Sequence, residues 1–475
     1  MKLTEYAQYD GLGLAQLVRH GEISAQELAA CATQAIVLLN PKLNAVIETY
    51  GERIMDADNC ITPDMPFAGV PFLLKDTGAT EAGKCQECGS RIGKGFVSSQ
   101  DAFLTQRYRA AGLNILGRTT LPEFAQAATT ESAHSGATRN PWDITRSTGG
   151  SSGGAAAAVA TGMVPIAHGT DTGGSIRIPA ACCGLVGLKP SRGRISKGPA
   201  LDETLYGGLN TEHVITRTVR DTAAILDATC HPASGDPFTI APPLRPYLDE
   251  VGAPPDKLRI AFGTAALDDP EMVAATGHIA QQLEAMGHMV EQALPEIDNE
   301  RYSQADHIVW AYSTAHEVSR LANATHNPID EHHLEPPTLE AVEIASQLSI
   351  DDWFEAMATY NYMRRTIGGF FEHYDVLLTP TTASPAPLLG VFNSNKPISF
   401  DDFMAITGNF CPHTAPFNVT GQPAISLPLC MSREGLPIGM QFVARFADEA
   451  TLIRLASALE IAMPWQDRRP PLHVA

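Results

Sequence analysis

The chain has 475 residues, of which 44% are hydrophobic and 18% charged, so it can bury a substantial core as one large domain or as two to three smaller ones. Its formal net charge of −20 leaves no basic surface that could displace counterions from nucleic acid, which argues against nucleic-acid binding and favours a small or neutral partner. The longest apolar run, near 155–164, is too short to span a bilayer, and the first 24 residues lack the apolar segment of a signal peptide, so we expect a cytoplasmic protein without membrane contacts.

Predicted helices and strands alternate along the first part of the chain, which is typical of an α/β fold. A helix is expected over 24–40, because Ser24 and the glutamate three residues later form a capping box before an apolar stripe. The run "FAGVPFLLKD" at 67–76 predicts a buried strand. Residues 101–126 predict a helix, then the strand "NILGRT", then the start of another helix.

The second part continues the pattern after a proline-rich link at 241–258. The strand "LRIAFG" is followed by the helix "MVAATGHIAQQLEAMGH". Near the end, "PAISLPLC" and "LPIGMQFVAR" flank the turn sequence "SREG" and predict a β-hairpin.

A glycine- and serine-rich stretch with few charges, at 147–191, is the most unusual part of the sequence. Its "GSSGG" matches the G-x-S-x-G pattern of an α/β-hydrolase nucleophile elbow, but no strand is predicted directly before it. Its "DTGGS" at 171–175 is similar to the active-site loop of aspartic proteases, but that loop needs a second copy, and the chain has none. Both readings are therefore disfavoured.

The glycines of "DTGGS" allow successive backbone N–H groups to converge as an anion-binding nest beside Ser175, which would form an oxyanion hole. A glycine-rich turn that packs a helix against a sheet explains Gly173 and Gly174 equally well, although it does not explain the serine. Lys75 follows the apolar run "VPFLL", where burial would lower its pKa and make it a general base. A strand-end lysine that extends to water is the alternative for this residue.

Taken together, "GVPFLLKD", "GATRNPWD", the stretch from 149 to 191 and "APFNVTGQPAISLP" resemble the amidase signature family of serine hydrolases over roughly residues 5–465. The resemblance implies an α/β fold with a large mixed central β-sheet covered by helices on both faces. It implies one domain over 1–475, with a core at about 65–220 and 375–470 and a more variable section for the substrate pocket at about 235–375.

Membership of this family implies amide C–N hydrolysis through a Ser-Ser-Lys triad and an acyl-enzyme. Ser175 resembles the nucleophile, Ser151 the bridging serine after a cis peptide bond to Gly150, and Lys75 the base. The remaining site residues implied are Thr172, Gly173 and Gly174, with the Ser175 N–H, as the oxyanion hole and Ser152 as a supporting residue. The family needs no metal or organic cofactor.

Other candidate residues are assigned structural roles. The nine cysteines are expected to be reduced, and the pair Cys85 and Cys88 lacks the second pair that a zinc site needs. His168 lies near the nucleophile in sequence, but the family uses no histidine base, so we expect a hydrogen-bonded structural residue. His332 and His333 lie in a polar stretch that favours a solvated surface.

The sequence defines the substrate less closely. Trp310 and Tyr312 could line an apolar pocket, although core packing at helical spacing is the stronger expectation. A small, largely uncharged amide is predicted, with a lactam or aminoalkanoate oligomer first and an anilide or carbamate next. The family also includes the glutaminase subunit of tRNA-dependent amidotransferases, which is the alternative function. The chain could act as a homodimer.

Overall fold

The computed structural model describes residues 1–62, 64–199, 205–238, 240–265 and 267–474. Residues 200–204 of the expected core section, and residues 239 and 266 of the expected variable section, lie outside the described residues.

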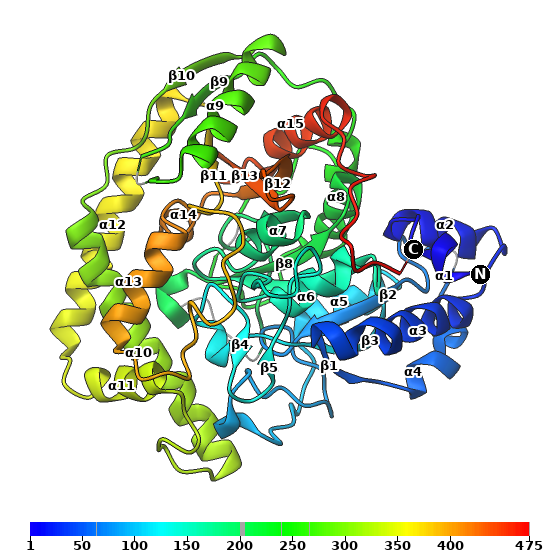
Figure 1. Cartoon of the computed structure of the whole chain (residues 1–475), viewed down its shortest axis with the longest axis horizontal. Coiled ribbons are helices and arrows are strands. Elements are labelled where there is room, and N and C mark those ends of the chain that lie inside the picture. Colours follow the sequence, from blue (N-terminus) through cyan, green and yellow to red (C-terminus); the bar gives the residue numbers. More distant parts are fainter. Residues whose placement is uncertain (63, 200–204, 239, 266, 475) are drawn as a thin grey trace.

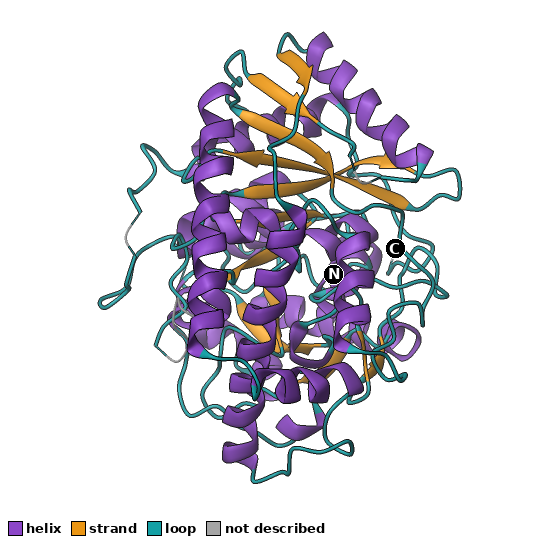
Figure 2. Cartoon of the chain, turned by 90° about the vertical axis from the view of Figure 1, so that its left-hand side faces the viewer, coloured by secondary structure: helices purple, strands orange, loops and turns teal. Residues whose placement is uncertain are grey.

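One large mixed sheet organises the molecule (Figures 1 and 2). Over the described residues it has eleven strands, and a separate two-stranded ribbon is formed by β4 and β5. In spatial order the strands of the large sheet are β1 (Val46–Thr49), β3 (Asn114–Thr119), β2 (Pro71–Lys75), β6 (Ile166–Asp171), β8 (Thr211–Thr216), β7 (Val186–Lys189), β12 (Ala424–Met431), β13 (Pro437–Ala444), β11 (Val376–Pro380), β9 (Arg259–Phe262) and β10 (Met289–Gln292), and those of the ribbon are β4 (Glu131–Ser132) and β5 (Gly136–Ala137).

Helices pack on both faces of this sheet, as the resemblance implied (Figure 2). Their bounds are α1 (Leu3–Tyr6), α2 (Gly11–Arg19), α3 (Ala25–Leu43), α4 (Glu52–Met55), α5 (Phe103–Ala110), α6 (Gly153–Ala160), α7 (Arg177–Cys183), α8 (Val219–Thr229), α9 (Pro270–Ala285), α10 (Asn299–Thr325), α11 (Pro336–Ala345), α12 (Ile350–His373), α13 (Phe400–Phe410), α14 (Pro416–Thr420) and α15 (Glu449–Ala462). None of the helices in the described ranges combines the length and apolar character needed to cross a membrane.

The strands β2 and β6 place the candidate catalytic residues. They are parallel neighbours, with Phe72 opposite Ile166, and every residue of both strands is buried. Coverage on both faces favours a near-continuous apolar run, which explains "PFLL" before Lys75 in β2. Because the carboxyl ends of parallel strands meet at the same sheet edge, Lys75 and Asp171, the last residues of β2 and β6, lie at the same edge.

Most predicted elements are confirmed. The strand "NILGRT" is β3, residue for residue, and β12 and β13 form the predicted antiparallel hairpin around "SREG". The capping box is present, because the Ser24 side chain accepts from the Glu27 N–H while the Glu27 carboxylate accepts from the Ser24 N–H.

The helix expected to start near residue 121 is wrong. Only one 3-10 turn forms there, Glu123–Ala125, and Phe124 has a left-handed backbone (φ 48°). Tertiary contacts replace the helix: the Phe124 N–H donates to the carbonyl of Cys88, and the buried Glu123 carboxylate accepts from the hydroxyl of Ser90 and the backbone N–H of Glu335.

Candidate active site

Lys75 is buried at the end of β2, with only 1% of its surface exposed. Its Nζ lies 2.7 Å from Ser151 Oγ, 3.0 Å from Ser152 Oγ and 2.7 Å from Thr170 Oγ1. Three hydroxyl groups therefore surround the amine at hydrogen-bonding distance, and it does not extend to water.

Burial has a direct consequence for the charge of this amine. It lowers the pKa of Lys75 to about 7, because the charged form loses its hydration, while the carboxylates of Asp171 and Glu212 act in the opposite direction. At mildly alkaline pH the amine is mostly neutral and can accept a proton from a neighbouring hydroxyl group.

The two serines beside Lys75 belong to the loop before α6. The peptide bond between Gly150 and Ser151 is cis, as the resemblance implied. The Ser152 hydroxyl also contacts β6, because it accepts from the Thr170 N–H at 3.3 Å. The helix α6 begins immediately afterwards and is buried along its whole length. Its first residue has to be glycine, since a Cβ on Gly153 would lie 2.2 Å from the hydroxyl oxygen of Thr130.

Ser175 lies in the turn between β6 and α7 and is 9% exposed, at the margin of the buried site. Its carbonyl accepts from the Ser152 N–H at 3.2 Å, which joins the two serine-containing segments. Within the described part of the chain, its hydroxyl has no hydrogen-bond partner. Lys75 and Ser151 are therefore in direct contact, whereas Ser151 and Ser175 are not hydrogen-bonded to each other.

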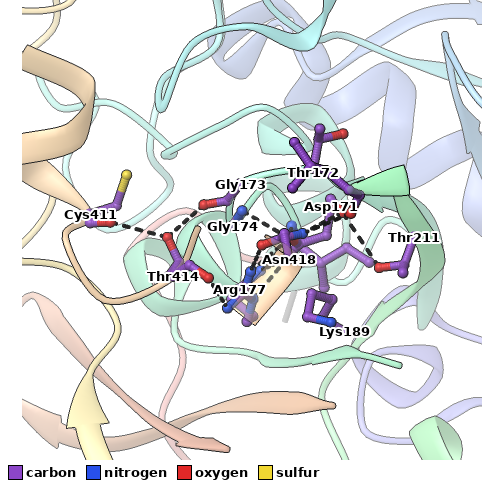
Figure 3. A network of polar contacts seen from close by, with 12 residues as sticks. Asp171, Thr172, Gly173, Gly174, Arg177, Lys189, Thr211, Cys411, Thr414 and Asn418 are labelled. Carbon is purple, nitrogen blue, oxygen red and sulfur yellow. Dashed lines mark hydrogen bonds and ion pairs between the residues drawn. The ribbon is translucent and has the colours of Figure 1, made fainter. Parts of the chain in front are cut away.

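A buried ion pair holds the loop that precedes Ser175 (Figure 3). The Asp171 carboxylate accepts from Arg177 Nε at 2.9 Å and Nη2 at 2.8 Å, and it also accepts from the Gly174 N–H at 2.8 Å. Burial alone would raise the pKa of Asp171, but the Arg177 guanidinium lowers it below its usual range. Asn418, from α14, donates to the Asp171 carboxylate and backbone carbonyl, at 2.9 and 2.8 Å, and accepts from Arg177 Nη2 at 2.6 Å.

This network changes which backbone groups are available at the expected oxyanion hole. The Gly174 N–H is already bound to Asp171. Among the described residues, the N–H groups of Thr172, Gly173 and Ser175 donate no hydrogen bond. The Thr172 hydroxyl donates to the side-chain oxygen of Asn210 at 3.1 Å.

The three histidines considered in the sequence, His168, His332 and His333, have the surroundings expected of structural or surface residues. His168 is fully buried, with Nδ1 accepting from the Lys75 backbone N–H and Nε2 lying 3.0 Å from Glu212. His332 is exposed in a turn, and His333 bonds the Asp330 side chain beside it.

The cysteines form no disulfide or metal-binding group in the described residues. Those with a described environment are free, including Cys85 and Cys88. His, Cys, Asp and Glu side chains do not gather into a group that could hold a metal ion in the described ranges.

A small pocket adjoins the loop 172–175 and is lined on its far side by α10. The Trp310 ring is tilted at 57° to the Tyr206 ring, with the centroids 5.0 Å apart, and it lies 3.9 Å from the position of a Cβ on Gly173. Glu317 and Arg320 also line the pocket and form an ion pair at 2.9 Å. Tyr312 points away, toward Trp353, so only one of the two aromatic residues considered lies at the pocket.

Sequence reasoning missed several of these contacts. Thr170 lies two residues after His168 in β6, so both side chains are on the same face of the strand, and the Thr170 hydroxyl contacts Lys75. Asn418 lies in "APFNVTGQPAISLP", a string whose resemblance to the family singles out no individual residue. No local signal identifies Glu317 and Arg320, because an ion pair three residues apart is common on helix surfaces.

Comparison with known proteins identifies the family. The family model described as Amidase matches residues 27–453. The 6-aminohexanoate-cyclic-dimer hydrolase of Paenarthrobacter ureafaciens is 38% identical over 98% of this chain and 96% of its own length. A putative amidase of Mycobacterium leprae is 36% identical over 96% of this chain and 95% of its own.

Solved structures show the same relationship. The structure of 6-aminohexanoate cyclic dimer hydrolase in complex with its substrate superposes with a TM-score of 0.93, at 37% identity over 98% of this chain and 99% of that one. A bacterial aryl acylamidase of the amidase signature family gives a TM-score of 0.88, at 26% identity over 96% of each chain. The fold, the family model and the near-complete coverage of these relatives establish that the chain belongs to the amidase signature family and is an amide C–N hydrolase.

Proposed function

We propose that Lys75, Ser151 and Ser175 form the catalytic triad of this hydrolase. The observation that carries the proposal is the contact of 2.7 Å between the buried Lys75 Nζ and Ser151 Oγ. Neutral Lys75 accepts the Ser151 proton while Ser151 accepts the Ser175 proton, and the Ser175 alkoxide attacks the amide carbonyl. The hydroxyl of Ser175 has to rotate toward Ser151 for the second transfer, which substrate binding can bring about.

The leaving amine receives the proton by the reverse route, and water then hydrolyses the ester to Ser175. The oxyanion of each tetrahedral intermediate is bound by the N–H groups of the 172–175 loop. Gly173 and Ser175 are the better donors in this proposal, because the Gly174 N–H is bound to Asp171.

The substrate we propose is a small amide without net charge, with a lactam or aminoalkanoate oligomer preferred over an anilide or carbamate. Two observations support it. The relative at 38% identity is a 6-aminohexanoate-cyclic-dimer hydrolase. The pocket wall is aromatic at Trp310 and Tyr206, and its two charged groups neutralise each other in the Glu317–Arg320 pair.

The test is hydrolysis by the purified protein of a matched panel: a cyclic aminoalkanoate dimer, the corresponding linear dimer, an anilide, a carbamate and glutamine. We expect the cyclic dimer to give the largest kcat/KM. Preferred hydrolysis of glutamine, or copurification of partner subunits, would instead support the amidotransferase alternative.

The nucleophile is tested on the same panel. Ser175→Ala should lower kcat by several orders of magnitude, in keeping with the loss of about 10⁶-fold seen when a serine hydrolase loses its nucleophile. A serine-directed phosphonate should label Ser175 in the wild type, as peptide mass spectrometry would show. Activity retained in a folded Ser175→Ala variant would exclude the assignment.

A further inference from the structure

The peptide unit between Gly173 and Gly174 is held at both of its polar ends (Figure 3). Its carbonyl accepts from the Thr414 hydroxyl at 2.6 Å, and its N–H donates to the Asp171 carboxylate at 2.8 Å. The carbonyl and N–H of a trans peptide point in opposite directions, so two such bonds fix the plane of the unit. Asp171 belongs to the glycine- and serine-rich stretch at 147–191, whereas Thr414 lies more than 200 residues further along the chain.

The orientation of this unit determines where its neighbours point. Rotation of the 173–174 peptide plane changes the backbone angles on which the directions of the Gly173 and Ser175 N–H groups depend. Neither of these two N–H groups has a hydrogen-bond partner in the described ranges. Gly174 itself has φ 133°, and a Cβ there would lie 2.5 Å from the Thr414 hydroxyl oxygen, so the approach requires glycine.

Thr414 is itself rigidly placed. It is fully buried in the turn before α14, and its backbone carbonyl accepts from Arg177 Nη1 at 2.9 Å. Its hydroxyl has one proton and two carbonyls within reach, that of Gly173 at 2.6 Å and that of Cys411 at 3.2 Å. The shorter contact identifies the Gly173 carbonyl as the acceptor.

We infer that Thr414 is a positioning residue for the oxyanion-binding loop. Its hydroxyl holds the 173–174 peptide so that the N–H groups of Gly173 and Ser175 face the reacting carbonyl of the substrate. Thr414 acts through the loop, since its hydroxyl is bound to backbone carbonyls and lines no part of the substrate pocket. The inference rests on the proposed triad and extends it to a residue outside the signature stretch.

The matched substitutions are Thr414→Val, which keeps the shape and removes the hydroxyl, and Thr414→Ser, which keeps the hydroxyl. Loss of an oxyanion donor costs about 10²–10³-fold in kcat, so misorientation of two donors in Thr414→Val should lower kcat by roughly 10- to 100-fold. The KM should stay within about twofold, because the amide ground state develops no oxyanion. Thr414→Ser should restore kcat to within about threefold of the wild type.

A second measurement distinguishes misorientation of the loop from a general loss of stability. A phenylboronic acid that adds to Ser175 mimics the tetrahedral intermediate, and its inhibition constant should rise by the same factor by which kcat falls in Thr414→Val. If Thr414→Val does not fold, Thr414→Ala serves as the hydroxyl-deficient variant with the same expected result. A general loss of stability, which the melting temperature would report, cannot explain a change confined to kcat and boronate affinity.

Three results would overturn the inference: a wild-type kcat in a variant lacking the hydroxyl, a loss confined to KM, or a Thr414→Ser variant as impaired as Thr414→Val. Ser175→Ala, assayed in parallel, reports on the proposed triad separately. If it stays active, the triad and this inference both fail. If it is inactive while Thr414→Val matches the wild type, only the role of Thr414 fails.

Discussion

The two walls of the active site hold their polar groups in different ways. On the sheet side, Lys75 is 1% exposed and contacts three hydroxyl groups, and Asp171 is fully buried within a network of hydrogen bonds. On the α10 side, the Glu317 and Arg320 side chains are 10% and 35% exposed and are held mainly by each other. Fixed groups without access to water suit proton transfer, whereas a more open wall suits discrimination between substrates. Substitutions in the first wall should therefore change kcat, and those in the second should change KM.

After the nucleophile itself, the largest effect is expected at the base. General acid–base catalysis contributes about 10²–10⁴-fold, and Lys75→Ala removes the base of the whole relay, so it should lower kcat/KM toward the upper end of that range, by about 10³–10⁴-fold. His168→Gln keeps a donor and an acceptor near Glu212 and the Lys75 backbone, so it should retain most activity and lose mainly thermal stability. Steady-state kinetics and melting temperature on the same preparations would decide. The reverse ranking would indicate a histidine base.

The bridging serine should give the next largest effect. Ser151→Ala removes the hydroxyl through which the proton passes, and we expect acylation to slow by about 10²–10³-fold. Ser152→Ala removes contacts with Lys75 and with the Thr170 backbone, so its loss should appear partly as a lower melting temperature. Pre-steady-state measurement of acylation compares the two. A folded but inactive Ser152→Ala beside an active Ser151→Ala would move the relay by one residue.

The difference between the walls also explains how much could be predicted from sequence. The three residues proposed as the triad lie in short segments with a recognisable sequence: Lys75 ends a buried apolar strand, and Ser151 directly follows Gly150, where a Cβ would lie 2.3 Å from the carbonyl oxygen of Thr129. The three positions proposed as the triad therefore follow from a resemblance between strings.

Long-range contacts account for what was missed. Thr414 reaches Gly173, and Asn418 reaches Asp171 directly before the loop, each across more than 200 residues of chain, and neither belongs to a catalytic pattern. The failed helix after residue 121 has the same origin, because Glu123 bonds Ser90 and Glu335 in preference to continuing a helix. Local propensity cannot register such partners.

Activity should depend on pH through Lys75. Since burial lowers the pKa of Lys75 to about 7 and the neutral amine is the active form, kcat/KM should rise through pH 7 and level off above it. At pH 6 it should be about tenfold below the plateau. The Glu212 carboxylate favours the protonated amine, so Glu212→Gln should move the midpoint to lower pH while keeping a hydrogen bond to His168. A midpoint that rises or stays fixed would contradict Lys75 as the titrating group.

The smallest effect is expected at the open wall, and it tests the comparison from the other side. Glu317→Gln leaves Arg320 without its carboxylate partner, so the pocket gains a positive charge. A partly exposed pair is worth about 1 kcal/mol, which corresponds to about a fivefold change in affinity. The KM of an anilide with a carboxylate at its far end should therefore fall by about fivefold relative to the KM of its methyl ester, with kcat unchanged. The double variant Glu317→Gln/Arg320→Gln restores neutrality and should abolish this preference. If Glu317→Gln lowered kcat for both anilides and left their KM ratio unchanged, α10 would serve the chemistry, and the division between a catalytic wall and a discriminating wall would be wrong.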